Sequence, residues 1–171
     1  LKQRILTALV IGPAAIVAIF YLPLNYFALF LLAIVSIGAW EWGPFMGLTS
    51  AVKRLVFVAA TLAFIVALWW HIPLSSFWEA PFVVNHALNY VLWGSFFWWC
   101  VAAILMLLYP KLTGLWSKNC VLKALFGWFT LIPTWAAFVL IRSHDYTLDS
   151  YQGAQLIMFL FLIVWSADIG A

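Results

Sequence analysis

Charged residues are scarce in this chain. Its 171 residues include 8 Lys and Arg and 5 Asp and Glu, so 8% are charged, whereas 68% are hydrophobic. A soluble domain carries roughly 25% charged residues. This composition excludes an ordinary soluble domain. It predicts an all-α, polytopic membrane protein that forms a single helical bundle over residues 1–171, with no soluble domain between the spans.

Cysteine is also scarce, and several motifs of soluble enzymes are missing. Cys100 and Cys120 show no metal-binding or redox spacing, and we interpret both as ordinary small residues. The sequence contains no Walker phosphate loop, no dinucleotide glycine fingerprint, no His-Glu-x-x-His and no Gly-x-Ser-x-Gly elbow. These absences argue against the enzyme classes that the motifs define.

Six long apolar segments are present instead. Lipid forces the backbone to satisfy its own hydrogen bonds, and the segments lack the alternation of barrel strands, so about six transmembrane helices are expected. Lys2 and Arg4 before the first segment resemble the start of a signal peptide. We reject this interpretation, because the segment is long enough to span the membrane, lacks a small-residue cleavage pattern and is followed at once by a second apolar segment. The segments run from Ile5 to Leu22, Leu24 to Trp40, Leu55 to Ile72, Ala87 to Tyr109, Val121 to Ile141, and Ala154 to Ala171.

Prolines shape these predicted helices. Pro23 leaves only a very short link, so the first two segments are expected to form a helical hairpin. Gly12-Pro13 and Pro133 are expected to bend their helices, and Pro133 also frees the carbonyl of Phe129 from its helical hydrogen bond. We interpret both bends as features of helix packing.

The distribution of Lys and Arg predicts the orientation, because short loops rich in these residues stay in the cytoplasm. With the N-terminus in the cytoplasm, seven basic residues lie inside and only Arg142 lies outside. Glu41 then joins the inner group. The inner basic residues are Lys2, Arg4, Lys53, Arg54, Lys111, Lys118 and Lys123, and the outer loops hold Glu79, His86, His144, Asp145 and Asp149.

Asp168 is the only acidic residue inside an uninterrupted apolar span. An aspartate at a span centre costs about 2.5–3.5 kcal/mol, and the eight Leu, Ile, Phe and Val residues of this segment contribute about 2.4–5 kcal/mol toward insertion. In the predicted orientation Asp168 lies about 20 Å along its helix, in the cytoplasmic half of a core about 30 Å thick. An ionisable group at this depth is a candidate functional residue.

Other polar residues have simpler interpretations. Glu41 stands between two tryptophans at a span end and is interpreted as a solvated interfacial carboxylate. The basic residues set topology first, and offer places for anionic headgroups or nucleotide phosphates second. His71 and His86 are interpreted as interfacial or loop residues. The pair His144-Asp145 offers weak cation binding, although polar residues between spans are the usual composition of a loop.

Four stretches, in this order and spacing, resemble the N-terminal part of bacterial phosphatidate cytidylyltransferase, also called CDP-diacylglycerol synthase. They are residues 1–8 (LKQRILTA), 39–43 (AWEWG), the region from Pro133 to Tyr146, and 165–171 (WSADIGA). Ile169 stands where the family often has Ser or Thr. The family's C-terminal signature, with Pro-Gly-His-Gly-Gly and Asp-Arg-x-Asp, is not found in these 171 residues. We therefore expect the main catalytic segment beyond Ala171, and no activity from this fragment alone.

The resemblance implies transfer of a cytidylyl group from CTP to phosphatidic acid, giving CDP-diacylglycerol and pyrophosphate in phospholipid synthesis. It also implies Mg²⁺, which accepts one or two carboxylates together with substrate phosphates. Asp168 is the candidate catalytic and metal-binding residue. Glu41 matches a glutamate that the family commonly carries and is a second candidate catalytic residue, with a role either in positioning the polar cavity or in metal binding. The implied setting is the bacterial inner membrane, as a multi-pass protein and possible homodimer, with no nucleic-acid partner.

Two other functions are open on the sequence. In a transporter or channel, Asp168 would line an ion or proton path, and flux would depend on it without any need for CTP. In a non-catalytic membrane scaffold, Asp168→Asn would behave as the parent does in every assay.

Overall fold

The computed structural model describes residues 2–80 and 82–170, and the side chains of residues 12–79 and 82–168. Over this range the chain forms seven α-helices, a short 3-10 helix and a small antiparallel hairpin. The elements are α1 (Lys2–Tyr21), α2 (Leu24–Met46), α3 (Ala51–His71), η1 (Leu74–Ser76), β1 (Trp78–Ala80), β2 (Val83–Val84), α4 (His86–Leu107), α5 (Thr113–Trp116), α6 (Cys120–Arg142) and α7 (Gln152–Gly170).

Each of the six predicted apolar segments contains one long helix, so the helical architecture is confirmed. Four described helices, α2, α3, α4 and α6, are long and apolar enough to cross a membrane. The described apolar parts of α1 and α7 are shorter, Gly12–Tyr21 and Gln152–Asp168. The fold is that of a multi-pass membrane protein with at least these four candidate spans. Six crossings and a cytoplasmic N-terminus remain predictions.

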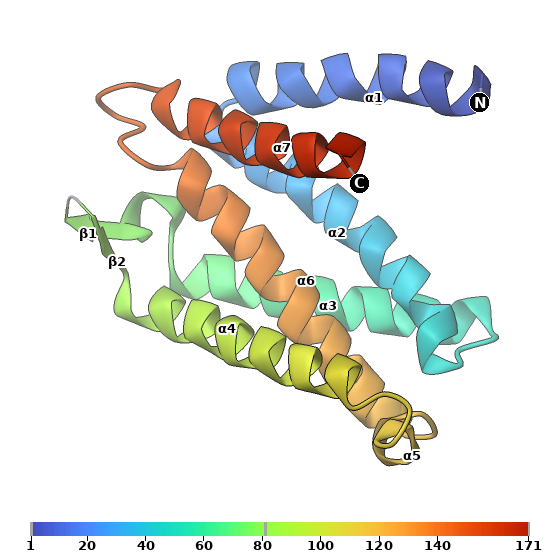
Figure 1. Cartoon of the computed structure of the whole chain (residues 1–171). Helices are drawn as coiled ribbons and strands as arrows, with labels where there is room; N and C mark the ends of the chain where they lie inside the picture. Colours follow the sequence, from blue (N-terminus) through green and yellow to red (C-terminus); the bar gives the residue numbers. More distant parts are fainter. Residues whose placement is uncertain (1, 81, 171) are drawn as a thin grey trace.

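Helix α6 lies at the centre of the bundle. It packs against α2, α3, α4 and α7, while α1 lies beside α7 and the start of α2 (Figure 1). The core includes Phe27 of α2, Ile65 of α3 and Trp135 of α6, all fully buried. The Trp135 indole Nε1 donates to the Ala28 carbonyl of α2 at 2.9 Å. A buried indole keeps its hydrogen bond in this way, and the bond ties the central helix to α2.

Local sequence signals explain several helix ends. Asn85 and Asn119 cap α4 and α6, because each side-chain oxygen accepts a backbone N–H of the first turn. Helix α2 runs past the predicted end at Trp40 and stops at Gly47, whose φ of 84° is left-handed and suits glycine.

Pro133 has the effect expected of a proline inside a helix. The Phe129 carbonyl, which has no N–H at position 133 to bind, accepts the hydroxyl of Ser95 from α4 at 3.3 Å. The unpaired carbonyl therefore becomes a contact between α4 and α6.

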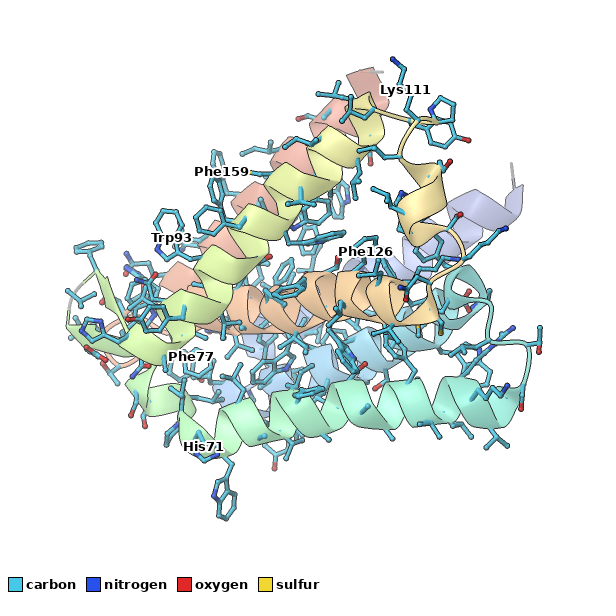
Figure 2. The ribbon with its side chains drawn as sticks, turned by 90° about the horizontal axis from the view of Figure 1, so that it is seen from below. His71, Phe77, Trp93, Lys111, Phe126 and Phe159 are labelled. Atoms are coloured by element: carbon cyan, nitrogen blue, oxygen red, sulfur yellow. The ribbon has the colours of Figure 1, made fainter. Side chains whose placement is uncertain are left out.

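The helices run alternately in opposite directions, which gives the bundle two chemically different ends (Figure 1). We call the end formed by residues 22–23, 72–85 and 143–151 the hairpin end, and the end formed by residues 47–50 and 108–119 the basic end. Lys111 projects from the basic end, whereas His71 and Phe77 lie at the hairpin end (Figure 2). Described basic side chains at or next to the basic end are Lys53, Arg54, Lys111, Lys118 and Lys123.

Candidate functional site

Asp168 is the last described side chain of α7, a helix that packs against α6 and α1. The side chain is exposed, and among the described residues it takes part in no hydrogen bond or salt bridge. Ile169, which follows Asp168, and the side chains of Lys2 and Arg4 lie outside the described side chains.

Glu41 is exposed near the C-terminal end of α2, as expected for an interfacial carboxylate. The residues on either side of it are fixed. The Trp42 indole Nε1 donates to the Lys123 carbonyl at 2.9 Å, and the Arg54 guanidinium lies 5.6 Å from the Trp40 ring centroid. This end of the bundle joins α2, α3 and α6, whereas Asp168 lies on α7. No hydrogen bond or salt bridge among the described residues brings the two carboxylates together.

The basic end is closely packed around two glycines. A Cβ on Gly43 would stand 2.7 Å from the Arg54 side chain, and a Cβ on Gly127 would stand 2.8 Å from the Trp42 indole. Arg54 also donates its Nε to the Leu48 carbonyl at 2.9 Å. Because the glycines allow this close approach, Arg54 is held in one position by backbone and aromatic contacts.

Among the described side chains, the cations of the basic end have no acidic partners. Within residues 12–79 and 82–168, the carboxylates that form salt bridges pair only with histidines. The sequence has no Asp or Glu between Glu79 and Asp145, a stretch that contains Lys111, Lys118 and Lys123. The positive charge at this end is therefore available to an anion from outside the bundle.

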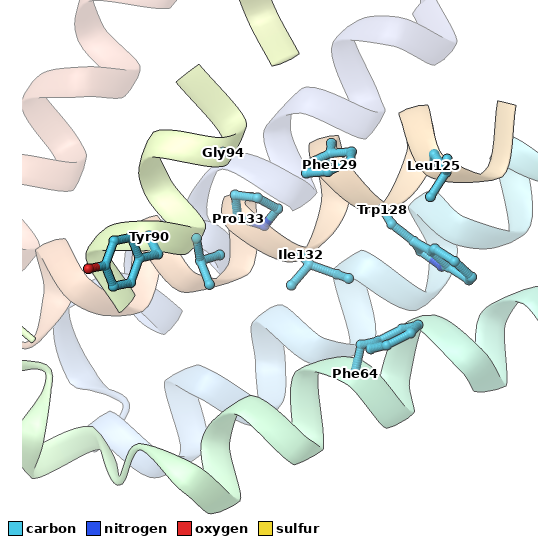
Figure 3. A pocket seen from close by; sticks show the side chains of 9 residues that line it. Phe64, Tyr90, Gly94, Leu125, Trp128, Phe129, Ile132 and Pro133 are labelled. Atoms are coloured by element: carbon cyan, nitrogen blue, oxygen red, sulfur yellow. The ribbon is translucent and has the colours of Figure 1, made fainter. Parts of the chain in front are cut away.

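Two apolar pockets open on the sides of the bundle. One, of about 250 Å³, lies between α3, α4 and α6, with Phe64 and Trp128 on one side of it and Tyr90 on the other (Figure 3). The other, of about 240 Å³, lies near the basic end between Phe45, Trp98, Trp116 and Phe126. The Lys123 ammonium lies 5.3 Å from the Phe45 ring centroid, beside this second pocket. Pockets of this kind suit hydrocarbon chains.

The described residues do not form a magnesium site by themselves. Mg²⁺ binding needs a carboxylate together with further oxygen ligands. Within the described residues no three His, Cys, Asp or Glu side chains gather at one place. Asp168 offers a single exposed carboxylate, and Glu41 is not beside it. The implied Mg²⁺ therefore stays a prediction, and no chemical step is assigned to it.

Arg142 is the buried ionisable residue that the sequence interpretation treated only as an outer charge. Its side chain is 1% exposed. Its guanidinium donates to three backbone carbonyls, those of Ile19 at 2.8 Å, Ser150 at 2.7 Å and Leu22 at 3.4 Å. It thus joins the α1–α2 link to the turn that precedes α7. The sequence did contain a signal for this role. Arg142 is the single Lys or Arg on the predicted outer side, where the rule that basic loops stay in the cytoplasm expects few.

His144 also differs from its expected role as an ordinary loop residue. It is 9% exposed, and its Nδ1 has no hydrogen-bond partner among the described residues. By contrast, His71 and His86 are exposed, as expected. Cys100 and Cys120 are exposed free thiols.

Comparison with known proteins identifies the family of this bundle. The sequence model of the cytidylyltransferase family matches residues 2–171. The chain belongs to this family. A phosphatidate cytidylyltransferase of Haemophilus influenzae is 38% identical over 171 residues, which are 100% of this chain and 59% of that protein. A phosphatidate cytidylyltransferase of Pseudomonas aeruginosa is 34% identical over 100% of this chain and 56% of that protein.

This cytidylyltransferase-family chain thus spans somewhat less than three fifths of the length of the curated relatives it matches. No solved structure matches it. The family match covers the exposed Asp168, the Glu41 region and the buried Arg142 alike, so all the residues singled out above lie within the shared region.

Proposed function

We propose that this chain forms part of a membrane enzyme that transfers a cytidylyl group from CTP to phosphatidic acid, giving CDP-diacylglycerol and pyrophosphate. The family match over residues 2–171 carries this proposal, together with two relatives that are named phosphatidate cytidylyltransferase and cover the whole chain. The bacterial relatives also favour the bacterial inner membrane as its location, with the basic end in the cytoplasm.

The proposed reaction forms one bond and breaks one. A phosphate oxygen of phosphatidic acid attacks the α-phosphorus of CTP, the bond from this phosphorus to the α–β bridging oxygen breaks, and pyrophosphate leaves with the electron pair. Both substrates are anionic, so they need cations that are not already paired with carboxylates. The basic end supplies such cations in Arg54 and Lys123, and the neighbouring apolar pocket suits an acyl chain of the lipid.

Asp168 is the proposed contributor of a carboxylate to the active site, and Glu41 is proposed to position groups at the cytoplasmic boundary. Asp168 is exposed at the last described turn of α7, where groups outside the described residues are free to approach it. Because it has no acidic or basic partner within the described residues, we propose that the site is completed by such groups. Residues 1–171 alone are accordingly expected to be inactive.

The test compares three single variants of the full gene product in membranes. Asp168→Asn is expected to lower CTP-dependent turnover of phosphatidic acid at least about 100-fold, which corresponds to about 2.7 kcal/mol of lost transition-state stabilisation. Glu41→Gln is expected to lower it by about tenfold or less. Asp149→Asn, at the hairpin end, is the matched control and should keep full turnover.

The contrary result is also specific. If Asp168→Asn turns over CTP as the parent does, Asp168 has no part in the chemistry. If the parent turns over no CTP but moves ions or protons across proteoliposomes in an Asp168-dependent way, the chain belongs to a transporter and the proposed reaction is wrong.

A further inference from the structure

The hairpin end contains a large pocket, of about 820 Å³. Its walls come from the α1–α2 link, the segment before η1, the β-hairpin and the turn of residues 143–148. These segments are distant in sequence but lie together at one end of the bundle (Figure 1). The pocket is far from the cations assigned to CTP and the lipid phosphate, so its use is independent of the proposed reaction.

A buried histidine faces this pocket without a hydrogen bond at one of its nitrogens. His144 lines the pocket, and its Nδ1 is fully buried with no hydrogen-bond partner among the described residues. Oδ2 of Asp145 lies 3.6 Å from this nitrogen, which is too far for a hydrogen bond. An unsatisfied buried nitrogen costs about 1–3 kcal/mol, so the packing around His144 must offset this cost.

Aromatic rings hold His144 in place. The Trp78 ring centroid lies 4.9 Å from that of His144, and the Phe82 ring centroid lies 5.4 Å from it. Trp78 is itself fixed, because its Nε1 donates to the Leu140 carbonyl of α6 at 3.1 Å. The imidazole is therefore not free to turn toward solvent, and the pocket wall is built in advance of any ligand.

Two residues of the same pocket have a positive φ. Phe82 has φ of 64° and Asp145 has φ of 49°, and both residues line the pocket. For the bulky Phe82 this conformation is an outlier that costs about 1–3 kcal/mol and persists where surrounding structure enforces it, whereas aspartate tolerates the left-handed region. The conformation thus places an aromatic ring and a carboxylate beside His144.

The charges of the pocket exclude an anion as its main ligand. No Lys or Arg lines it, and the nearby Arg142 uses its N–H groups on backbone carbonyls. Asp145 adds a negative charge. The Asp145 carboxylate, whose Oδ2 lies 3.6 Å from the buried Nδ1 of His144, therefore presents acceptors beside aromatic rings.

A primary ammonium group matches this arrangement. It has N–H donors for the carboxylate oxygens, and its charge is attracted by the carboxylate and by the faces of nearby aromatic rings. The rest of the pocket includes Asn25, Ser75 and Thr147, whose amide and hydroxyl groups are able to donate to a phosphodiester oxygen. Because the pocket lies at the end of apolar spans, where lipid headgroups stand, we propose that it binds the headgroup of a zwitterionic phospholipid through its primary ammonium.

The test uses the full gene product in nanodiscs or mild detergent and short-chain lipids that differ only in the headgroup. Phosphatidylethanolamine is expected to bind at least tenfold more tightly than either of two control lipids. Phosphatidylcholine keeps the positive charge of the headgroup nitrogen but has no N–H donor, and N-acetylated phosphatidylethanolamine lacks that positive charge. Native mass spectrometry and lipid-dependent thermal shifts measure the affinities. This comparison needs no variant and so does not depend on a mutant that folds.

Variants then locate the site. Asp145→Asn keeps the shape of the side chain and is expected to weaken phosphatidylethanolamine binding at least tenfold, as is His144→Ala. Glu79→Gln, at an acid–histidine pair outside the pocket, is the matched control and should bind as the parent does.

Several results would overturn the proposal. Equal binding of the ethanolamine and choline lipids would remove the need for an N–H donor. Equal binding of free ethanolamine would assign the pocket to a soluble amine instead of a lipid. Displacement of the lipid by micromolar Zn²⁺, with no lipid preference in metal-free buffer, would make it a metal site formed by His144 and Asp145.

Discussion

Arg142 is predicted to be the residue whose loss most destabilises the hairpin end. In Arg142→Met the side chain keeps much of its length but loses every N–H donor. Two of the bonds it makes are short, at 2.8 and 2.7 Å, and the third, at 3.4 Å, is long. Hydrogen bonds to a charged group contribute about 1.5–3 kcal/mol each, so the two short bonds account for roughly 3–6 kcal/mol.

Part of this loss is offset, because methionine no longer buries a charge. We therefore expect a net loss of about 2–4 kcal/mol in the free energy of unfolding. For a chain of this size that corresponds to a melting temperature lower by roughly 4–16 °C. Arg142→Lys keeps the charge without the planar fork of donors and should fall between parent and methionine variant.

The assay is thermal unfolding of the detergent-solubilised protein, followed by size-exclusion chromatography after heating, with limited proteolysis of the 143–151 turn as a local readout. Lys111→Met, an exposed change at the opposite end, is the control and should melt within about 2 °C of the parent. If Arg142→Met also melts within 2 °C and its turn is cleaved no faster, the three carbonyl contacts do not stabilise the fold.

Two further predictions concern packing and topology. Gly127→Val places carbon atoms against the Trp42 indole and should lower the free energy of unfolding by about 1–3 kcal/mol in the same melting assay. Gly114→Ala, whose Cβ meets open space, should lower it by less than about 1 kcal/mol. Equal effects would mean that the close approach of Gly127 to Trp42 does not contribute to stability. In a protein without accessible native cysteines, Lys53→Cys should react with impermeant maleimide only in inverted vesicles. Ser75→Cys should react only in right-side-out cells. The opposite pattern would reverse the predicted orientation.

The sequence predicted the helices well because apolar runs of this length have few alternatives in lipid. One specific contact was partly predictable. The sequence predicted that Pro133 leaves the Phe129 carbonyl without its helical hydrogen bond, and the structure then showed that this carbonyl accepts the Ser95 hydroxyl. The extension of α2 past Trp40 was missed, because Glu41 and Pro44 resemble a span end by composition. Helix α2 continues there through packing of Trp42 on α6 and ends where Gly47 permits a left-handed turn.

The candidate site was less predictable, for a physical reason. The burial of Arg142 and His144 depends on segments more than a hundred residues earlier, such as Ile19, and on the β-hairpin, whose short strands have no periodic signal. Asp168 was found by its charge alone. A charge that is costly to insert into a membrane marks a position of interest, but the sequence does not show which groups that charge contacts.

The central claim is the reaction itself, and one measurement tests it most directly. Membranes that contain the full gene product, from cells without another cytidylyltransferase, are supplied with CTP and phosphatidic acid. The account predicts equal molar formation of CDP-diacylglycerol and pyrophosphate, dependent on both substrates. Absence of CDP-diacylglycerol while the folded protein is present in those membranes would contradict it.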